Sequence, residues 1–265
     1  MMSGLRIENL ESVYNKTITA ISGVSLEVPA GRIVSLMGVN GSGKSTTLNA
    51  IAGLLRGDPQ EIAAGSIWFD DERIDGRPPH EVVRRGIVLV PEREKIFETL
   101  TVAENLQASV APPTITPAAH KERLAEVYEL FPALMERKNA VAGFLSGGQR
   151  QMLAMARALL CHPRLLLVDE MTLGLAPLVI ADLLGRLCHM RASLGVSVLL
   201  VEQNVSAALE VADYGYIMEK GRIVFHGTPD KLRSHDDVRE FYLGLGDTGA
   251  RSYRDVKQYR RAHRW

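Results

Sequence analysis

The sequence predicts an α/β fold in which a glycine-rich loop connects a buried strand to a helix. Residues 32–37 are apolar and partly β-branched, as in a buried strand, and residues 47–55 favour a helix. Further apolar runs at 86–90, 165–168 and 196–201 have the length of strands that are buried on both faces of a parallel sheet. Strands of this kind separated by helices are typical of α/β proteins.

The loop after the first strand matches the phosphate-binding pattern G-x-x-x-x-G-K-[ST]. It reads Gly38, Val39, Asn40, Gly41, Ser42, Gly43, Lys44, Ser45 and Thr46. The glycines allow backbone N–H groups to converge on an anion, and the helix N-terminus adds partial positive charge. Lys44 supplies a charge for the β- and γ-phosphates, and the Ser45 hydroxyl suits Mg²⁺. The alternative is a chance match in a glycine-rich turn, which the flanking strand and helix disfavour.

Length and composition narrow the class of protein. The 265 residues are enough for one large α/β domain or for a core with an inserted subdomain. Lys+Arg and Asp+Glu are both 31, and this balance argues against a general nucleic-acid binder. Cys161 and Cys188 lack metal-type spacing and are expected to be packing residues. Without a signal-peptide pattern or a bilayer-length apolar run, we expect a cytosolic chain whose membrane role comes through a partner.

The first 28 residues predict a small β layer beside the nucleotide site. Residues 5–10 and 24–28 alternate between apolar and polar, which indicates two half-exposed strands. Tyr14 lies between these strands. It could stack on an adenine ring, although a packing tyrosine fits its position as well.

Between the loop helix and the middle of the chain, residues 65–76 predict a strand and turn, and residues 80–85 predict a short helix. The strand at 86–90 stops at Pro91. Glu92 follows at the carboxyl end of that strand, where ligands gather in parallel sheets.

The sequence pattern changes at residues 92–163, which predict a helical insertion in the α/β core. Thr101 and Glu104 form a capping box, and residues 121–130 are amphipathic. The chain is therefore divided into four parts. These are a first core part with the β layer at 3–91, an α-helical subdomain at 92–163, a second core part at 164–240, and a linker with a basic tail at 241–265. The tail is either a solvated segment or a docking segment for an acidic partner or membrane surface.

A second anion site is predicted at residues 145–149, Leu-Ser-Gly-Gly-Gln, which open a helix. Ser146 can cap this helix, and Gly147 and Gly148 expose backbone N–H groups at its start. Two phosphate-type helix N-termini in one chain suggest that two chains share nucleotides between them. An ordinary capped helix is the alternative.

Carboxylates follow the next buried strand. Residues 165–170 read Leu-Leu-Leu-Val-Asp-Glu, which places Asp169 and Glu170 at the carboxyl edge of the sheet. Asp169 would hold Mg²⁺, and Glu170 could polarise the attacking water. The strand after it ends in Glu202-Gln203-Asn204, so no histidine reaches the γ-phosphate from there.

Residues 38–46, 145–149 and 165–170 together resemble the ATP-binding subunits of ABC transporters, over about residues 3–240. The resemblance implies a P-loop NTPase (RecA-like) core with an antiparallel β layer and an inserted α-helical subdomain. It implies ATP and Mg²⁺ as cofactors, and head-to-tail dimers with two ATPs at the interface. Tyr14 would then stack on adenine. The residues that would contact ATP held by the opposite subunit are Ser146, Gly147, Gly148 and Gln149.

Departures from the family pattern narrow the subtype. Glu92 stands where the family usually has Gln, Gln203 where it has the switch histidine, and Ala176 where it has Asp. Glu92 can bind Mg²⁺ or a water, and Gln203 can hydrogen-bond a γ-phosphate but cannot become cationic. With Val-Pro-Glu, Leu-Gly-Leu-Ala-Pro and Val-Glu-Gln-Asn, the chain resembles one of the paired ATPases of branched-chain amino acid importers. Since Glu170 is present, we expect hydrolysis to be retained.

This resemblance implies several partners. They are a second ATP-binding subunit, as a paralogue in a heterodimer, two membrane permeases and, indirectly, a solute-binding protein, with no nucleic acid. The chain would lie at the cytoplasmic face of the inner membrane. A non-transport ABC ATPase acting on ribosomes or DNA is the alternative, which the single cassette and neutral charge disfavour. A P-loop kinase or GTPase would not carry the 145–149 motif.

Overall fold

The computed structural model describes residues 4–15, 17–55, 60–92 and 96–243. The predicted basic tail, and the linker beyond residue 243, lie outside the described residues. In the described parts of the chain, no helix has both the length and the apolar character that a bilayer crossing demands.

Most strands lie where the sequence predicts them, whereas several of the helices were not predicted. The strands are β1 (Gly4–Tyr14), β2 (Ile18–Pro29), β3 (Ile33–Met37), β4 (Gln60–Phe69), β5 (Glu72–Arg73), β6 (Ile87–Val90), β7 (Leu165–Asp169), β8 (Ser197–Glu202), β9 (Tyr214–Glu219) and β10 (Arg222–Gly227). The helices are α1 (Lys44–Ile51), α2 (Pro79–Arg84), α3 (Val102–Gln107), α4 (Pro117–Leu130), α5 (Pro132–Glu136), the 3₁₀ turn η1 (Ala142–Phe144), α6 (Gly147–Leu160), α7 (Pro177–Leu194), α8 (Val205–Val211), α9 (Pro229–Ser234) and α10 (Asp236–Phe241).

The predicted β layer is a four-stranded antiparallel sheet with the order β2-β1-β4-β5. β1 and β2 pair along their whole lengths, from Gly4 opposite Pro29 to Tyr14 opposite Ile18. β4 begins five residues before the strand that was predicted from Gly65. Gly65 has φ +93° and lies where the β1–β4 register shifts, so the glycine that suggested a strand boundary instead marks a bulge.

The nucleotide core is a six-stranded sheet with the order β10-β9-β3-β8-β7-β6. Its strands are parallel from β9 to β6, and β10 is antiparallel to β9. Every residue of β3, β7 and β8 is buried. Side chains of these strands alternate between two hydrophobic cores, with Leu166 and Val168 in one and Leu165 and Leu167 in the other. This explains why the three segments read as continuous apolar runs.

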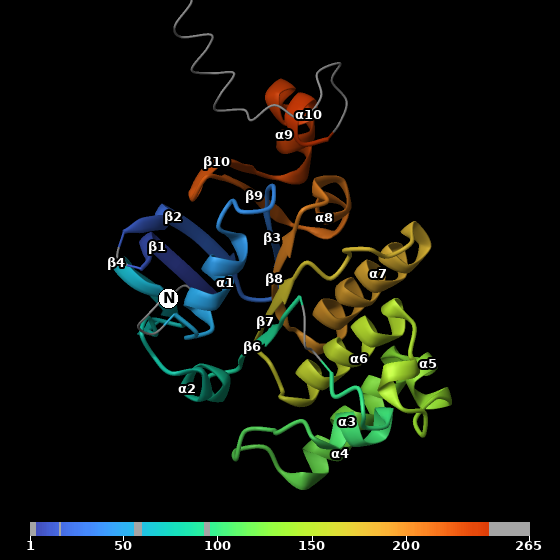
Figure 1. The fold of residues 1–265 in the computed structure, drawn as a ribbon. Coiled ribbons are helices and arrows are strands. Elements are labelled where there is room, and N and C mark those ends of the chain that lie inside the picture. Colours follow the sequence, from blue (N-terminus) through green and yellow to red (C-terminus); the bar gives the residue numbers. More distant parts are fainter. Residues whose placement is uncertain (1–3, 16, 56–59, 93–95, 244–265) are drawn as a thin grey trace, which may run out of the picture.

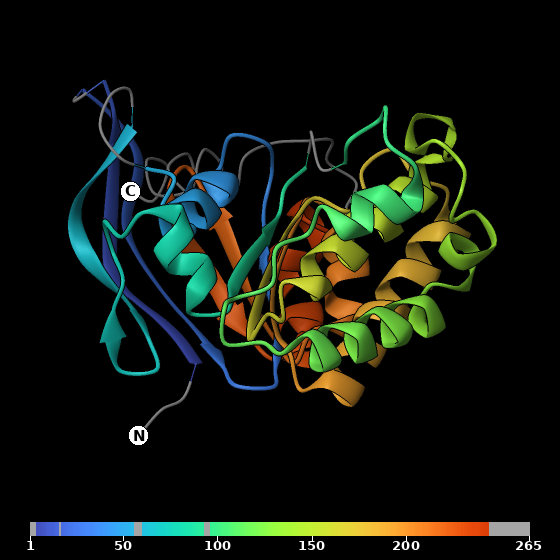
Figure 2. The same ribbon diagram turned by 90° about the horizontal axis from the view of Figure 1, so that it is seen from below.

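The two faces of this sheet are covered differently. The antiparallel sheet and α1 cover one face, and α6, α7 and α8 cover the other (Figure 1). Seen from below, α3 to α6 form a group on the side away from the antiparallel sheet (Figure 2). The segment predicted as helical therefore contains α3, α4, α5 and α6. The boundaries predicted for it at residues 92 and 163 stay predictions, because α6 also packs against β6 and shares the core of the sheet.

Candidate functional site

The glycine-rich loop runs between β3 and α1, as predicted. Gly38 has φ +154°, and a Cβ there would lie 2.2 Å from the Met218 carbonyl oxygen. Gly43 is the N-cap of α1 in the left-handed region, with φ 108°, and no side chain caps this helix. The first N–H groups of α1 are thus left for an external acceptor, which is the arrangement of an anion site at a helix N-terminus.

Lys44 begins α1, and its ammonium group lies inside the loop. The side chain is 3% exposed. Its Nζ donates to the carbonyl oxygens of Gly38 (2.9 Å) and Val39 (3.1 Å) and lies 3.2 Å from Oε1 of Glu170. The charge is therefore held inside the glycine-rich loop, beside Glu170.

Strand register brings the predicted carboxylates to one edge. Asp169, the last residue of β7, pairs with Val201, and Met37, the last residue of β3, pairs with Glu202. The Ser45 hydroxyl donates to Oδ1 of Asp169 at 3.2 Å. Burial raises the pKa of Asp169, and the negative charges of Glu170 and Glu92 act in the same direction. Ser45, Asp169 and Glu92 thus belong to one electrostatic neighbourhood, and their role as metal ligands stays a prediction.

This neighbourhood fits a hard divalent cation. A cation would stabilise the charged form of Asp169, whose pKa is raised by burial and, in addition, by the neighbouring carboxylates. The donors are a hydroxyl and carboxylates, which Mg²⁺ prefers. Over the described ranges, no three His, Cys, Asp or Glu side chains form a metal-binding group. Mg²⁺ bound through one or two carboxylates and the phosphates of a nucleotide needs no such group. Ser45 and Asp169 are the residues that would hold it, with Glu92 nearby.

Glu170 follows Asp169 in a strained backbone conformation. Its φ is 43°, in the left-handed region that non-glycine residues rarely adopt. Its N–H donates to the Val201 carbonyl oxygen at 2.9 Å, and its carboxylate pairs with Lys44. It shares a hollow of about 260 Å³ with Gln203, which is exposed at the end of β8. The two side chains predicted to act on the γ-phosphate and the attacking water therefore line the same hollow.

The motif at residues 145–149 caps α6. Ser146 accepts a hydrogen bond from the Gln149 N–H, and Gln149 accepts one from the Ser146 N–H, which completes a capping box. Ser146 and Gly147 are exposed, whereas a Cβ on Gly148 would lie 2.5 Å from Val179 at the start of α7. α6 and α1 cover opposite faces of the sheet (Figure 1). The fold therefore presents two glycine-rich helix starts at separate places.

Comparison with known proteins identifies the family. A family described as "ABC transporter" matches residues 21–173. The chain is 42% identical to the high-affinity branched-chain amino acid transport ATP-binding protein BraG of Pseudomonas aeruginosa, over 91% of this chain and 99% of BraG. It is 37% identical to the lipopolysaccharide export system ATP-binding protein LptB of Haemophilus influenzae, over 92% of this chain and 98% of LptB. The chain belongs to the ABC transporter family.

Solved structures agree with this assignment. The ADP conformation of MJ1267, an ATP-binding cassette of an ABC transporter, superposes with a TM-score of 0.79 at 28% identity, covering 92% of this chain and all of that one. The predicted P-loop NTPase fold is thus confirmed. As an ABC transporter subunit, the chain is an ATPase that uses ATP and Mg²⁺ and works with membrane permeases.

In this ABC cassette Tyr14 lies beside the P-loop. It pairs with Ile18, two residues before Ala20, or roughly 7 Å along the strand. A Cβ on Gly43 would lie 3.0 Å from the Ala20 carbonyl oxygen, so β2 touches the loop at this point. The Tyr14 side chain is 37% exposed. Its position allows adenine stacking, and that role stays a prediction.

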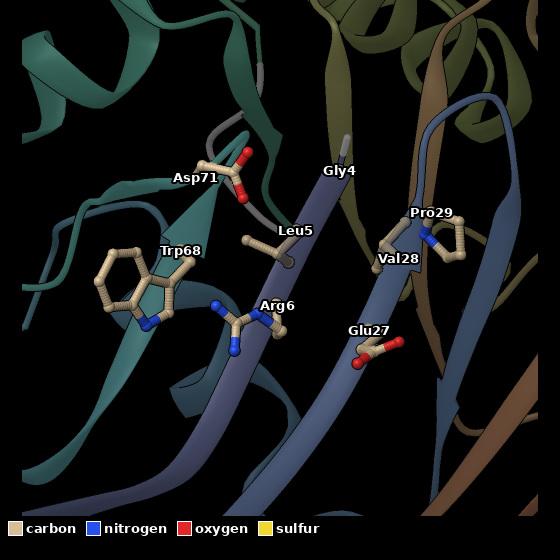
Figure 3. A pocket seen from close by; sticks show the side chains of 8 residues that line it. All are labelled: Gly4, Leu5, Arg6, Glu27, Val28, Pro29, Trp68 and Asp71. Atoms are coloured by element: carbon tan, nitrogen blue, oxygen red, sulfur yellow. The ribbon is translucent and has the colours of Figure 1, made fainter. Parts of the chain in front are cut away.

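A second hollow lies at the far end of the antiparallel sheet. Gly4, Pro29 and Trp68 line it, and the Arg6 guanidinium lies 5.6 Å from the Trp68 ring centroid (Figure 3). Its volume is about 60 Å³, below the few hundred Å³ that a small-molecule site needs. Since Gly4 and Tyr14 are at opposite ends of β1, this hollow is separate from the nucleotide site of the cassette.

One polar pair near the site of this ABC subunit could not be predicted from the sequence. Glu202, at 1% exposure, accepts hydrogen bonds from the Thr172 N–H (3.1 Å) and the Thr172 hydroxyl (2.6 Å). Burial raises the pKa of Glu202 to about 7, although both hydrogen bonds lower it. The signal was a glutamate that directly follows the apolar residues 198–201, but nothing in the sequence identified its partner 30 residues earlier.

Proposed function

We propose that this subunit drives the import of branched-chain or related hydrophobic amino acids. It would be one of two paralogous ATPases under two permeases, with a solute-binding protein delivering the solute. The permeases would hold it at the cytoplasmic face of the inner membrane. Similarity to BraG across nearly the whole of both chains is the observation that carries this proposal. Glu92 and Gln203, in the pattern of such importers, support it.

The residues of this chain would share the chemistry as follows. N–H groups of the loop and Lys44 orient the phosphates, and Tyr14 stacks on the base. Ser45 and Asp169, with Glu92 nearby, would hold Mg²⁺, which would supply positive charge to offset the negative charge of the nucleotide phosphates. Glu170 lies beside Lys44 and accepts a proton from the attacking water. Gln203 hydrogen-bonds the γ-phosphate but brings no positive charge.

Two chains would be needed for each complete site. The N-terminus of α6 is exposed and on the other face of the sheet from α1, so it is free to approach a nucleotide held by a partner. Ser146, Gly147, Gly148 and Gln149 would then contact the ATP of the opposite subunit. This chain would contribute its P-loop to one site and its α6 to the other.

The transported solute is tested by co-purifying this subunit with its permeases and partner ATPase and measuring the ATPase rate of the complex. We expect the ATPase rate of the assembled transporter to rise several-fold when the binding protein carries leucine, isoleucine or valine. The same binding protein without solute is the control. A rate that does not respond to any hydrophobic amino acid would contradict the importer proposal.

Lipopolysaccharide export is the second candidate function, because LptB matches almost as fully as BraG does. If the subunit serves lipopolysaccharide export, its permeases should extract a lipid from the membrane. The ATPase rate of the complex should then respond to lipopolysaccharide in that membrane. Reconstitution in vesicles with and without lipopolysaccharide separates the two candidates. Action on ribosomes or DNA has no comparable support, since the net charge is near zero.

A permease docking surface is proposed around Phe97 and Glu98. The Phe97 side chain is 48% exposed, and the Arg157 guanidinium lies 4.4 Å from its ring centroid. Asn105, which is fully buried, donates to the Phe97 carbonyl oxygen (2.9 Å) and accepts from the Phe97 N–H (2.8 Å). The Glu98 carbonyl oxygen accepts from Gly143. The turn is thus fixed by buried hydrogen bonds while its aromatic ring stays accessible.

A photoactivatable phenylalanine analogue at position 97 is expected to crosslink to a permease in the assembled transporter. The analogue at Leu54, which is 51% exposed beyond α1, is the matched control and should give no such product. Products are identified by mass spectrometry of the crosslinked bands. Equal labelling from both positions, or none from position 97, would contradict docking at this surface.

A further inference from the structure

Glu202 forms a buried clamp on the segment that follows Glu170. It is the last residue of β8, and its two carboxylate oxygens accept from the backbone and the side chain of Thr172. Thr172 is itself 5% exposed, so the pair is shielded from water. A carboxylate that satisfies both donors of one residue fixes the position of that residue in a way that a single hydrogen bond does not.

The clamp acts where the backbone is strained. Glu170 has φ 43°, a conformation that is unfavourable for a non-glycine residue and persists only when its surroundings enforce it. Two contacts from β8 enforce it. The Val201 carbonyl oxygen accepts from the Glu170 N–H, and Glu202 holds Thr172 two residues later. The turn that aims Glu170 at Lys44 is therefore fixed on both sides.

The same segment continues to the start of α6. A Cβ on Gly147 would lie 3.0 Å from Cδ2 of Leu175, three residues after Thr172. The segment from Glu170 to Leu175 thus connects the P-loop side of the cassette with the exposed helix start. Gln203 is the neighbour of Glu202, so the clamp also fixes the end of the strand that carries this side chain.

We infer that Glu202 is a positioning residue for ATP hydrolysis, which holds Glu170 in its working orientation through Thr172. The inference rests on the role proposed for Glu170. Glu202 acts through its hydrogen bonds to Thr172 rather than through its charge or through contact with the nucleotide. Loss of the clamp therefore lowers the rate of the chemical step and leaves nucleotide binding nearly unchanged.

The test uses the full chain assembled with its permeases. The variants are E202A and T172V, which remove hydrogen bonds, and E202Q and T172S, which keep them. A glutamine can accept from the Thr172 N–H and donate to its hydroxyl oxygen, so E202Q rebuilds the clamp without the charge. S197A is the matched control, because Ser197 at the other end of β8 is 5% exposed and accepts from the Gly31 N–H.

We expect kcat to fall about 10- to 100-fold in E202A and by a smaller factor in T172V, since small displacements of a catalytic group have effects of this size. KM and the Kd of a fluorescent ATP analogue should stay within about twofold of wild type. E202Q, T172S and S197A should keep kcat within about threefold. Thermal unfolding shows whether the variants that are compared are folded. If E202A does not fold, the inference is tested with T172V, because valine is nearly the same size and shape as threonine.

Three outcomes would overturn the inference. The first is an unchanged kcat in T172V. The second is a loss of kcat in the clamp variants that is matched by an equal loss of nucleotide affinity. The third is an E202Q variant as slow as E202A, which would mean that the charge of Glu202 matters rather than its hydrogen bonds. E170Q is measured in parallel to separate the two proposals. Normal turnover in E170Q would overturn the role of Glu170 itself, whereas slow E170Q with normal T172V overturns only the clamp.

Discussion

Replacing Glu170 with Gln is expected to lower the ATPase rate about 100- to 10,000-fold, the usual contribution of a general base. The glutamine keeps the size of the side chain but cannot take a proton from water. Lys44 keeps its hydrogen bonds to the carbonyl oxygens of Gly38 and Val39, so the loop should still bind nucleotide. Phosphate release by the assembled transporter measures the rate, and a fluorescent ATP analogue measures binding.

Glu210 offers a matched control for this substitution. It is exposed on α8 and is not among the residues of the site, so E210Q should hydrolyse ATP like the wild type. An E170Q transporter that turns over normally would contradict the assignment of Glu170. An E170Q transporter that has also lost ATP binding would instead make Glu170 a part of the loop structure.

Much of the fold could be predicted because its central strands are buried on both faces. β7 and β8 are largely apolar and end in Asp169 and Glu202, and β3 is apolar except for Ser35. Parallel pairing brings the carboxyl ends of these three strands to one edge. The position of Asp169 beside Ser45 follows from that pairing. The capping box at Thr101 and the cap at Ser146 were also predictable, because each depends on residues close together in the sequence, and at Ser146 the structure adds a full box with Gln149.

Features that depend on residues far apart in the chain could not be predicted. The clamp between Thr172 and Glu202 exists only because β7 and β8 are neighbours, and nothing in the sequence pairs these two residues. The long helix α7 was not predicted, and its sequence begins with a proline and includes a glycine at position 185. Its buried residues are apolar because α6 and the sheet pack there, which is a property of the tertiary structure.

Replacing Lys44 with Ala is expected to weaken ATP binding about 100-fold or more. The variant loses charge-assisted hydrogen bonds to phosphate, each of which contributes about 1.5–3 kcal/mol, and about 1.4 kcal/mol corresponds to a tenfold change in affinity. Lys231, exposed on α9, provides the control, and K231A should bind ATP normally. Titration with the fluorescent analogue measures the affinity. Equal affinities of K44A and wild type would contradict the placement of the phosphates at this loop.

K44A should also lower the stability of the chain, because Glu170 stays in a site where it is 7% exposed and loses its cationic partner. Breaking a buried ion pair from one side costs about 3–5 kcal/mol. The double variant K44A/E170Q removes the unpaired charge as well, so its free energy of unfolding in urea should exceed that of K44A although both variants are inactive. If the double variant is instead the less stable of the two, the pair is not the electrostatic unit that its 3.2 Å contact indicates, and Glu170 would be held by its backbone alone.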